Sequence, residues 1–298
     1  MPTRPLGRTG HDVSLICLGG QAALAEPDNE DVANAVIERA LDLGVNYIDT
    51  APRYGKPDRW SERNIAGVMK RRRREVYLAS KTHDRTRDGS LRLLDESLRT
   101  LGVETLDAWQ LHFVTTMDDV EQIFAPGGAI EALQRARDEK LVRFLGVTGH
   151  ADPHVLMECL RRFPFDQILL AVNAADPFHM SFQAELLPMA HAMGIGIVGM
   201  KATGRKRLLA SWKPTAQDRE DSTGFTLLPG TFTIKDALDY TLTLPLSSVA
   251  VGCDNVAGLE EAVAVALAWQ PLGREQVAAM NERARPLARQ ALFFRRWP

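Results

Sequence analysis

The chain has 298 residues, of which 45% are hydrophobic and 25% charged, and its 36 Lys and Arg against 38 Asp and Glu give a net charge of -2. This composition is ordinary for a folded globular protein, and the near-neutral charge provides no overall basic field for nucleic acid or anionic lipid. We therefore expect neither a nucleic-acid nor a membrane partner. Because barrels of about 250 residues commonly remain undivided, we expect one domain over 1–298.

The first residues of the chain lack the apolar run of a signal peptide, and no later segment approaches the roughly 20 apolar residues of a membrane span. The three cysteines, Cys17, Cys159 and Cys253, are odd in number and widely separated. Such spacing favours neither a disulfide framework nor a Cys-x-x-Cys metal site. We predict a cytoplasmic protein.

Short apolar, β-branched runs alternate with segments of helical periodicity along the chain. The predicted strands are 13–18, 45–49, 76–81, 106–111, 144–147, 167–172, 196–200 and 248–251, and the predicted helices include 31–43, 90–101, 130–141 and 259–269. Eight repeats of strand and helix indicate a parallel sheet that closes. The predicted fold is therefore an α/β (β/α)8 TIM barrel, with an extra C-terminal helix packed outside it from Arg274 onward.

Local signals mark several helix ends. Gly44 and Gly102 each follow a helical run, where glycine most easily adopts a left-handed cap. Asp152 followed by Pro153 predicts a helix start after the fifth strand. An open doubly wound sheet is the competing architecture, but the glycine fingerprint at 194–199 precedes its strand instead of following one. The weakly periodic segment 205–230 is predicted to be a long loop after the seventh strand.

Four chemically active side chains lie where predicted strands end: Asp49, Tyr54, Lys81 and His112. Taken singly, each is more simply a turn residue, a half-buried ring, a surface charge or an interior histidine. Together they fit the carboxyl end of a barrel, where reactive groups gather. An ammonium at Lys81 is expected to lower the pKa of Tyr54 toward neutral, while Asp49 keeps the lysine charged. His112 would orient a substrate oxygen.

The segment 46–55, Asn-Tyr-Ile-Asp-Thr-Ala-Pro-Arg-Tyr-Gly, with the later lysine and histidine, resembles the aldo-keto reductase superfamily and its Asp, Tyr, Lys, His tetrad. The opening segments 4–10 and 13–20 are also similar to that family, and the likeness continues to about Ala268. The resemblance implies reduction of a small-molecule aldehyde or ketone by an NAD(P)H-dependent enzyme, with Tyr54 as general acid.

Cofactor contacts follow from the same resemblance. The positions that match the family's pattern are Gly20, Thr148, Asn173, Lys201, Thr203, Gly204, Arg205, Gly252, Cys253 and Glu261, whereas Gly149, Met200, Asp254 and Asn255 depart from it. Gly149 replaces an asparagine, for which His150 is a possible substitute, and Met200 replaces a tyrosine that stacks on the nicotinamide. At the ribose, Asp254 disfavours a 2′-phosphate unless basic residues of the preceding loop, 205–207, oppose it. NADPH is the first choice of cofactor and NADH the second.

Other readings remain open at this point. A cofactor-binding regulatory or scaffold protein could retain the same tetrad, and a barrel hydrolase could use Asp49 and His112 with a metal. We expect no metal site, because His150 and His154 lack an intervening Glu and have Pro153 between them. Four arginines at 71–74 are interpreted as a solvated helix end. Gln21, Trp60 and Phe113 are candidates for the mouth of the pocket, and the substrate and oligomeric state stay undetermined.

Overall fold

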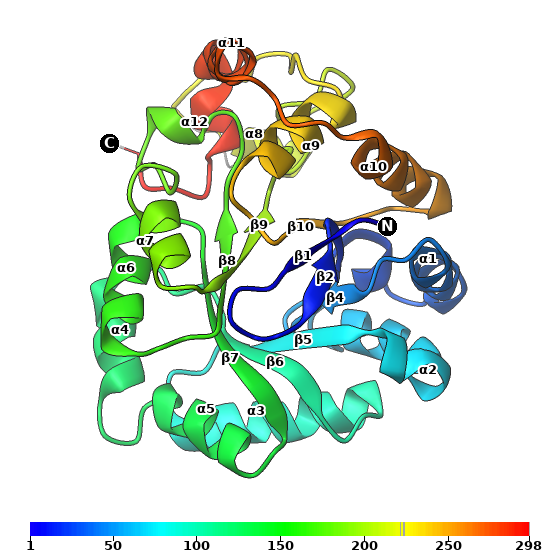
Figure 1. The fold of residues 1–298 in the computed structure, drawn as a ribbon, viewed down its shortest axis with the longest axis vertical. Helices are drawn as coiled ribbons and strands as arrows, with labels where there is room; N and C mark the ends of the chain where they lie inside the picture. Colours follow the sequence, from blue (N-terminus) through cyan, green and yellow to red (C-terminus); the bar gives the residue numbers. More distant parts are fainter. Residues whose placement is uncertain (221, 223, 298) are drawn as a thin grey trace.

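The computed structural model describes residues 1–220, 222 and 224–297, and its centre is a closed barrel of eight parallel strands in chain order. Figure 1 shows this ring surrounded by helices. The barrel strands are β3 (Ile16–Gly19), β4 (Tyr47–Asp49), β5 (Tyr77–Thr82), β6 (Leu106–Leu111), β7 (Val142–Gly149), β8 (Gln167–Ala171), β9 (Gly196–Met200) and β10 (Ser248–Val251). Parallel pairing of β10 with β3 closes the ring. The predicted (β/α)8 barrel is confirmed.

Seven of the predicted strands each overlap one barrel strand, but the first, 13–18, is divided. Val13 and Ser14 belong to β2 (Asp12–Ser14), which pairs antiparallel with β1 (Thr3–Pro5). This hairpin lies at the amino-terminal end of the barrel, where the backbone N–H of Arg8 donates to the carbonyl of Gly194 just before β9. A continuous apolar run contains no periodicity signal for such a break, so the prediction joined two strands.

Helices cover the outside of the barrel. They are α1 (Glu30–Asp42), α2 (Trp60–Arg72), α3 (Arg87–Leu101), α4 (Met117–Phe124), α5 (Ala129–Asp138), α6 (Pro153–Arg162), α7 (Leu186–Ala192), α9 (Ile234–Thr243) and α10 (Val256–Ala268). The predicted start of α6 is confirmed, because the Asp152 carboxylate accepts a hydrogen bond from the backbone of His154 at 2.9 Å. Gly44 and Gly102 have φ of 82° and 66°, in the left-handed region that favours glycine.

The segment after β9 is not loop throughout. It contains the short helix α8 (Ala216–Glu220), while positions 221 and 223 of the predicted loop lie outside the described residues. The C-terminal region folds as α11 (Arg274–Ala284) and α12 (Ala288–Ala291), which confirms an extra helical region outside the barrel. In the part of the chain that the structure describes, no helix has the length and apolarity needed to cross a bilayer.

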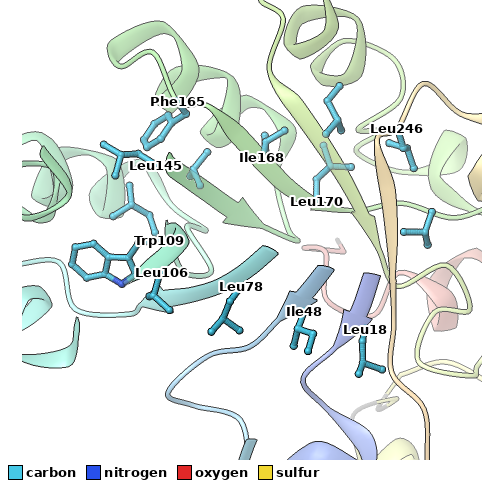
Figure 2. Close-up of a cluster of buried hydrophobic side chains, with 14 of the residues drawn as sticks. Leu18, Ile48, Leu78, Leu106, Trp109, Leu145, Phe165, Ile168, Leu170 and Leu246 are labelled. Carbon is cyan, nitrogen blue, oxygen red and sulfur yellow. The ribbon is translucent and has the colours of Figure 1, made fainter. Parts of the chain in front are cut away.

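Alternating side chains of the barrel strands form two buried layers. One layer fills the space between barrel and helices, as Figure 2 shows for Leu18, Ile48, Leu78 and Trp109. Burying a leucine or isoleucine of this kind contributes about 1.5–3 kcal/mol. The other layer lies inside the barrel and includes Cys17 and several small or aromatic residues. It forms a packed floor beneath the carboxyl-terminal end.

Two tyrosines and a glutamine make the polar part of that floor. The hydroxyl of Tyr77 donates to Gln167 Oε1 at 2.8 Å, and Gln167 Nε2 donates to the hydroxyl of Tyr47 at 3.1 Å. Buried polar groups are tolerated when they are hydrogen-bonded in this way. The interior is therefore filled below Asp49, and reactive chemistry is confined to the opposite, carboxyl-terminal end.

Candidate active site

The four tetrad residues come together at the carboxyl-terminal end of β4, β5 and β6. Lys81 Nζ donates to Asp49 Oδ2 at 2.6 Å and to the carbonyl of Thr50 at 2.7 Å. The same ammonium lies 5.0 Å from the ring centroid of Tyr54, and the Tyr54 and His112 ring centroids are 5.7 Å apart. Carboxylate, ammonium, phenol and imidazole therefore share one mouth of the barrel.

The Asp49–Lys81 ion pair is almost completely excluded from water, with 4% and 1% of the two side chains exposed. Burial alone would lower the pKa of Lys81, but Asp49 and Tyr54 favour the ammonium and the net pKa is raised. The lysine is consequently charged across the neutral range. A fixed positive charge beside the phenol is thus built into the strands themselves.

The pKa of Tyr54 differs from the expectation. Burial raises the pKa of its phenol, and although the Lys81 charge and hydrogen bond lower it, the net pKa lies above the ordinary value. The predicted shift toward neutral is therefore wrong. Desolvation of the phenolate outweighs the ammonium because the ring is deeply enclosed. The phenol stays protonated at neutral pH, which is the state that a proton donor needs.

His112 is a neutral imidazole. Burial and the nearby Lys81 charge hold its pKa well below the usual value. Its Nδ1 is buried and has no hydrogen-bond partner within the described part of the molecule. Its backbone N–H donates to the carbonyl of Thr82, which fixes the ring at the end of β6. A neutral imidazole can donate one hydrogen bond to an oxygen in the mouth.

Gln110 is a residue of this site that the sequence reading missed. Its Nε2 donates to Asp49 Oδ1 at 2.9 Å, so the carboxylate is held from both sides. Gln110 and His112 are two positions apart and therefore point to the same face of the strand, into the barrel. A buried polar residue within the otherwise apolar end of the strand, at Trp109 to Leu111, is the signal that could have identified it.

The end of β7 supplies the next predicted positions. Thr148 is buried, and its hydroxyl oxygen accepts from the backbone N–H of Phe113 at 2.9 Å. A side chain at Gly149 would lie 2.9 Å from Leu156 and from the carbonyl of Val114, so packing excludes the asparagine that the resemblance implies at this position. The His150 ring lies 5.0 Å from that of Phe113. Its pKa is held well below the usual value by burial and then by the Lys201 charge.

The ends of β8 and β9 bring amide and ammonium groups to the same mouth. Asn173 is engaged with the backbone, since Nδ2 donates to the carbonyl of Lys201 and Oδ1 accepts from Ala175. Met200 ends β9 and is buried. Lys201 adopts φ of 61° and donates to Gln21 Oε1 at 3.2 Å. Burial, followed by the Arg205 charge, lowers the pKa of Lys201 to about 8.

The loop after Lys201 differs from the expected pyrophosphate loop in one respect. Gly204 has φ of 58°, and a side chain there would come within 3.0 Å of Ala291 in α12. The space beside Gly204 that was predicted for a ligand is therefore occupied by the backbone of α12. Thr203 accepts at its hydroxyl from the backbone of Lys206. The guanidinium of Arg205 lies 5.6 Å from the ring of Phe293 and is otherwise exposed to solvent.

Two further basic residues of that loop have protein partners. Lys206 forms an ion pair of 2.6 Å with Asp254, and both side chains are 59% exposed. Arg207 is buried, pairs with Asp218 at 2.8 Å and lies 3.8 Å from the ring of Phe293. Arg207 is therefore a structural residue and not the extra ribose charge that we expected. Asp254 is opposed by Lys206 instead.

The loop after β10 contains both surface and core positions. Cys253 is buried in the outer hydrophobic layer, and burial raises the pKa of its thiol to about 12. Its side chain is a core residue, contrary to the expected cofactor contact. Asn255 caps α10 by accepting from the backbone of Gly258 at 2.9 Å. Gly252 and Glu261 are exposed.

Close packing next to the tetrad explains why residue 20 is a glycine. Its N–H donates to the carbonyl of Asp49 at 2.7 Å, and a side chain would lie 2.7 Å from Ser61 Oγ. Glycine is required there whether or not a ligand approaches. Among the predicted mouth residues, Phe113 is 44% exposed and Gln21 contacts Lys201, whereas the Trp60 ring lies beside Arg63 at the start of α2.

These observations define a class of protein. A closed parallel barrel whose carboxyl-terminal end holds a protonated phenol, a buried ammonium and a neutral imidazole is suited to an enzyme that moves a proton to or from an oxygen. The cationic side chains of Lys201 and Arg205 lie after β9 at the same end of the barrel, as an anionic cofactor requires.

Comparison with known proteins narrows the class. The model of the Aldo/keto reductase family matches residues 15–271. L-galactose dehydrogenase of Arabidopsis thaliana is 28% identical over 294 residues, covering 92% of this chain and 90% of that protein. Pyridoxal 4-dehydrogenase of Microbacterium luteolum is 25% identical over 236 residues, covering 65% and 68%. The holo form of aldo-keto reductase AKR11C1 from Bacillus halodurans has a TM-score of 0.75 at 23% identity, over 95% of this chain and 96% of that one.

The chain belongs to the aldo/keto reductase family. It is an oxidoreductase of a family that uses nicotinamide cofactors and acts on small-molecule carbonyl compounds. The superfamily resemblance drawn from the sequence is confirmed.

Proposed function

We propose that the protein reduces aldehyde or ketone carbonyls to alcohols with NADPH, and that Tyr54 is the proton donor. The observation that carries the proposal is the position of Lys81, whose ammonium is paired with Asp49 and interacts with the Tyr54 phenol. A carbonyl oxygen gains negative charge as its carbon is reduced. The side chains around this mouth are arranged to neutralise that charge.

The roles of the side chains follow from their protonation states. The Tyr54 phenol is protonated at neutral pH and transfers its proton to the substrate oxygen, while Lys81 stabilises the phenolate that remains. Neutral His112 donates a hydrogen bond to the same oxygen. Losing one donor of this kind costs about 3–4 kcal/mol of transition-state stabilisation. When bound, the reduced nicotinamide supplies the hydride.

The residues around the mouth fit a nicotinamide dinucleotide. Buried Thr148 and Asn173 would hold the carboxamide, and the cations of Lys201 and Arg205 would face the pyrophosphate. His150 Nδ1 is buried and has no partner in the described part of the chain, as expected for a group that faces a ligand. We favour NADPH over NADH because the Lys206 ammonium neutralises Asp254. The positive charge of Arg205 is then in excess and can attract the 2′-phosphate.

The names of two relatives indicate which substrates to test first. Two relatives are named as dehydrogenases, one of L-galactose and one of pyridoxal, which supports aldehydes and their hydroxylated relatives as the first compounds to test. The reverse reaction, oxidation of the alcohol with NADP+, uses the same groups with the proton moving to the Tyr54 phenolate.

A fluorescence titration with NADPH and NADH, followed by turnover of an aldehyde, ketone and sugar panel, tests the proposal. We expect tighter binding of NADPH, and Tyr54→Phe should lower kcat by about 10²–10⁴ with little change in cofactor binding. Tyr240→Phe is a matched control, because it removes a buried hydroxyl in α9 that donates to Gln183 Oε1 at 3.1 Å and lies outside the tetrad. Binding without turnover of any compound, or normal turnover by Tyr54→Phe, contradicts the proposal.

A further inference from the structure

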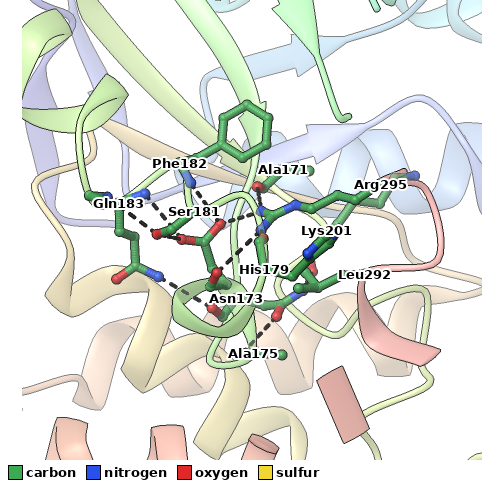
Figure 3. A network of polar contacts seen from close by, with 12 residues as sticks. Ala171, Asn173, Ala175, His179, Ser181, Phe182, Gln183, Lys201, Leu292 and Arg295 are labelled. Atoms are coloured by element: carbon green, nitrogen blue, oxygen red, sulfur yellow. Dashed lines mark hydrogen bonds and ion pairs between the residues drawn. The ribbon is translucent and has the colours of Figure 1, made fainter. Parts of the chain in front are cut away.

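The last residues of the chain return to the barrel mouth. Figure 3 shows Arg295 at the centre of a polar network with the loop after β8. Its guanidinium forms an ion pair with Asp176 and donates to the carbonyls of Ala171, Asp176 and His179. Both side chains of the pair are fully buried. The C-terminal segment, defined here as residues 292–297, is therefore fixed to the loop that begins with η3 (Asp176–Phe178).

The carboxylate of Asp176 is itself held by its own loop. It accepts from the hydroxyl of Ser181 at 2.6 Å and from the backbone of Phe182 and Gln183, each at 3.1 Å. A buried charge needs this many partners, because each oxygen that leaves water must be satisfied. The arrangement sets the position of Arg295 with little freedom. It also sets the position of its neighbour Phe294.

Rings on both sides of Arg295 add to the anchor. Trp297 stacks on His179 with ring centroids 3.9 Å apart, and its indole N–H donates to the carbonyl of Leu292 at 3.1 Å. Phe293 lies on the guanidinium of Arg207 at 3.8 Å. The segment is thus bound at both ends, with Phe294 between them.

Phe294 faces the part of the mouth that the tetrad does not use. Its ring lies 5.7 Å from that of His150, at 70°, and it packs against the barrel-interior cluster that includes Met200. The resemblance implies a nicotinamide contact at the position of Met200, and it makes His150 the substitute for the asparagine that is missing at Gly149. The ring is half-buried, so part of it remains open to the mouth.

We propose that Phe294 is a positioning residue for the nicotinamide ring, held in place by the buried Arg295–Asp176 pair. The inference rests on the proposed function, since it assumes that a nicotinamide cofactor binds here. Met200 stands where the resemblance implies a tyrosine that stacks on the cofactor, and the C-terminal segment brings an aromatic ring to the same neighbourhood. An aromatic ring in offset or edge contact with a planar ring contributes binding energy beyond that of the area it buries.

The experiment compares NADPH with 2′-phospho-ADP-ribose, which lacks the nicotinamide. Phe294→Ala should raise the Kd of NADPH about 10-fold and leave the Kd of 2′-phospho-ADP-ribose within about twofold of wild type. Phe294→Tyr keeps the aromatic ring and should bind NADPH with a Kd close to that of the wild type. Phe178→Ala is the control, because this half-buried ring lies in the loop that receives the segment and contacts Arg285 at 4.2 Å. Circular dichroism verifies that each variant is folded.

The outcomes separate the possible failures. Equal loss of both ligands would show that the segment supports the whole site and would overturn the assignment to the nicotinamide. Tighter NADPH binding by Phe294→Ala would show that the ring competes with the cofactor, which also overturns it. Unchanged binding in Phe294→Ala, with normal wild-type binding, refutes the inference alone. Absence of NADPH and NADH binding by the wild type refutes the proposed function and the inference together.

Discussion

Two buried ion pairs lie near the carboxyl-terminal end of the barrel, and they differ in what their cations can do. Asp49–Lys81 joins neighbouring strands, whereas Asp176–Arg295 joins residues 119 positions apart. The ammonium of Lys81 has a proton-bearing phenol beside it. The guanidinium of Arg295 is enclosed by one carboxylate and three backbone carbonyls. Burial of an ion pair alone therefore does not identify a reactive site; a proton-bearing phenol beside the cation does.

The chemistry of the two cations reinforces this contrast. Lysine is a compact charge whose hydrogen-bond donors can be redirected, while arginine presents a rigid fork suited to fixing a position. A proton leaving Tyr54 changes the charge that Lys81 faces. Arg295 instead faces the Asp176 carboxylate, backbone carbonyls and the rings of Phe182 and Phe294, and none of these contacts within the described residues is a phenol. We expect loss of the first pair to lower both stability and turnover, and loss of the second to lower mainly stability.

The largest effect is expected for Lys81→Met. Without the ammonium, the Tyr54 phenolate loses its stabilising charge, and kcat/KM for a reducible aldehyde should fall by about 10²–10⁴. Because Asp49 would remain buried and unpaired, urea denaturation should also show a loss of about 3–5 kcal/mol. Lys70→Met, at an exposed position of α2, is the control and should change neither quantity.

A double variant separates charge burial from catalysis. Asp49→Leu combined with Lys81→Met removes both charges, so much of the lost stability should return. Turnover should not return, because the ammonium is still missing. Recovery of turnover by the double variant would contradict a direct role for Lys81.

Arg295→Met is the matching change in the second pair. It leaves Asp176 without its cation, so the free energy of unfolding should fall by about 3–5 kcal/mol. At saturating cofactor, kcat should fall by less than about tenfold, because no tetrad residue is altered. Arg285→Met is the control, since that arginine pairs with Glu282 at the surface. A collapse of kcat as deep as that of Lys81→Met would erase the distinction between the two pairs.

Gln110→Leu tests whether the hydrogen bond from Gln110 to Asp49 matters for catalysis as well as for stability. Its hydrogen bond to the Asp49 carboxylate is buried, and losing a bond to a charged group costs about 1.5–3 kcal/mol, measured by urea denaturation. A less firmly held Asp49 should lower kcat by about tenfold or less. Gln167→Leu removes a buried glutamine whose hydrogen bonds run to neutral tyrosines, so it should affect stability and spare kcat. Equal effects of the two variants on kcat would deny Gln110 a positioning role.

The elements that the sequence predicted well are those encoded by local pattern. Barrel strands are short apolar runs between helices, and the residues at their carboxyl ends, such as Asp49 and Lys81, must meet once the barrel closes. The predicted bounds of β6, β9 and β10 agree with the structure for this reason. Asp49, Lys81 and His112 were placed by the ends of the predicted strands, whereas Tyr54 lies in the loop after β4 and was identified with the help of the family resemblance.

The errors have a different physical origin, because they depend on burial and on distant contacts. The direction of the Tyr54 pKa shift is decided by desolvation, which no spacing reveals. Cys253 and Arg207 were interpreted as site residues but are buried among core or paired partners. Gly204 approaches Ala291, and Arg295 meets Asp176, across separations that no local pattern spans. The tail from Arg274 onward, rich in Arg and Ala, was predicted only as a helix packed outside the barrel, because the sequence does not reveal its partners.

The smallest predicted effect concerns pH and the cofactor side of the mouth. Burial, followed by the Arg205 charge, lowers the pKa of Lys201 to about 8, so this lysine is cationic below pH 8 and becomes neutral above it. If the ammonium faces the pyrophosphate, its charge favours binding only while it is protonated. The Kd of NADPH should therefore rise about two- to fivefold between pH 7 and 9.5, the range expected for one partly exposed charge contact.

Lys201→Arg provides the control for this pH dependence. Arginine stays protonated throughout the range, so the rise in Kd should disappear, although the absolute affinity can differ because the two side chains bind anions differently. The tetrad should be unaffected, since Lys81 has a raised pKa and remains charged over the same interval. An unchanged pH profile in Lys201→Arg would assign the titration to another group. A wild-type Kd that is flat from pH 7 to 9.5 would remove Lys201 from the cofactor site, and the cationic side of the mouth would then rest on Arg205.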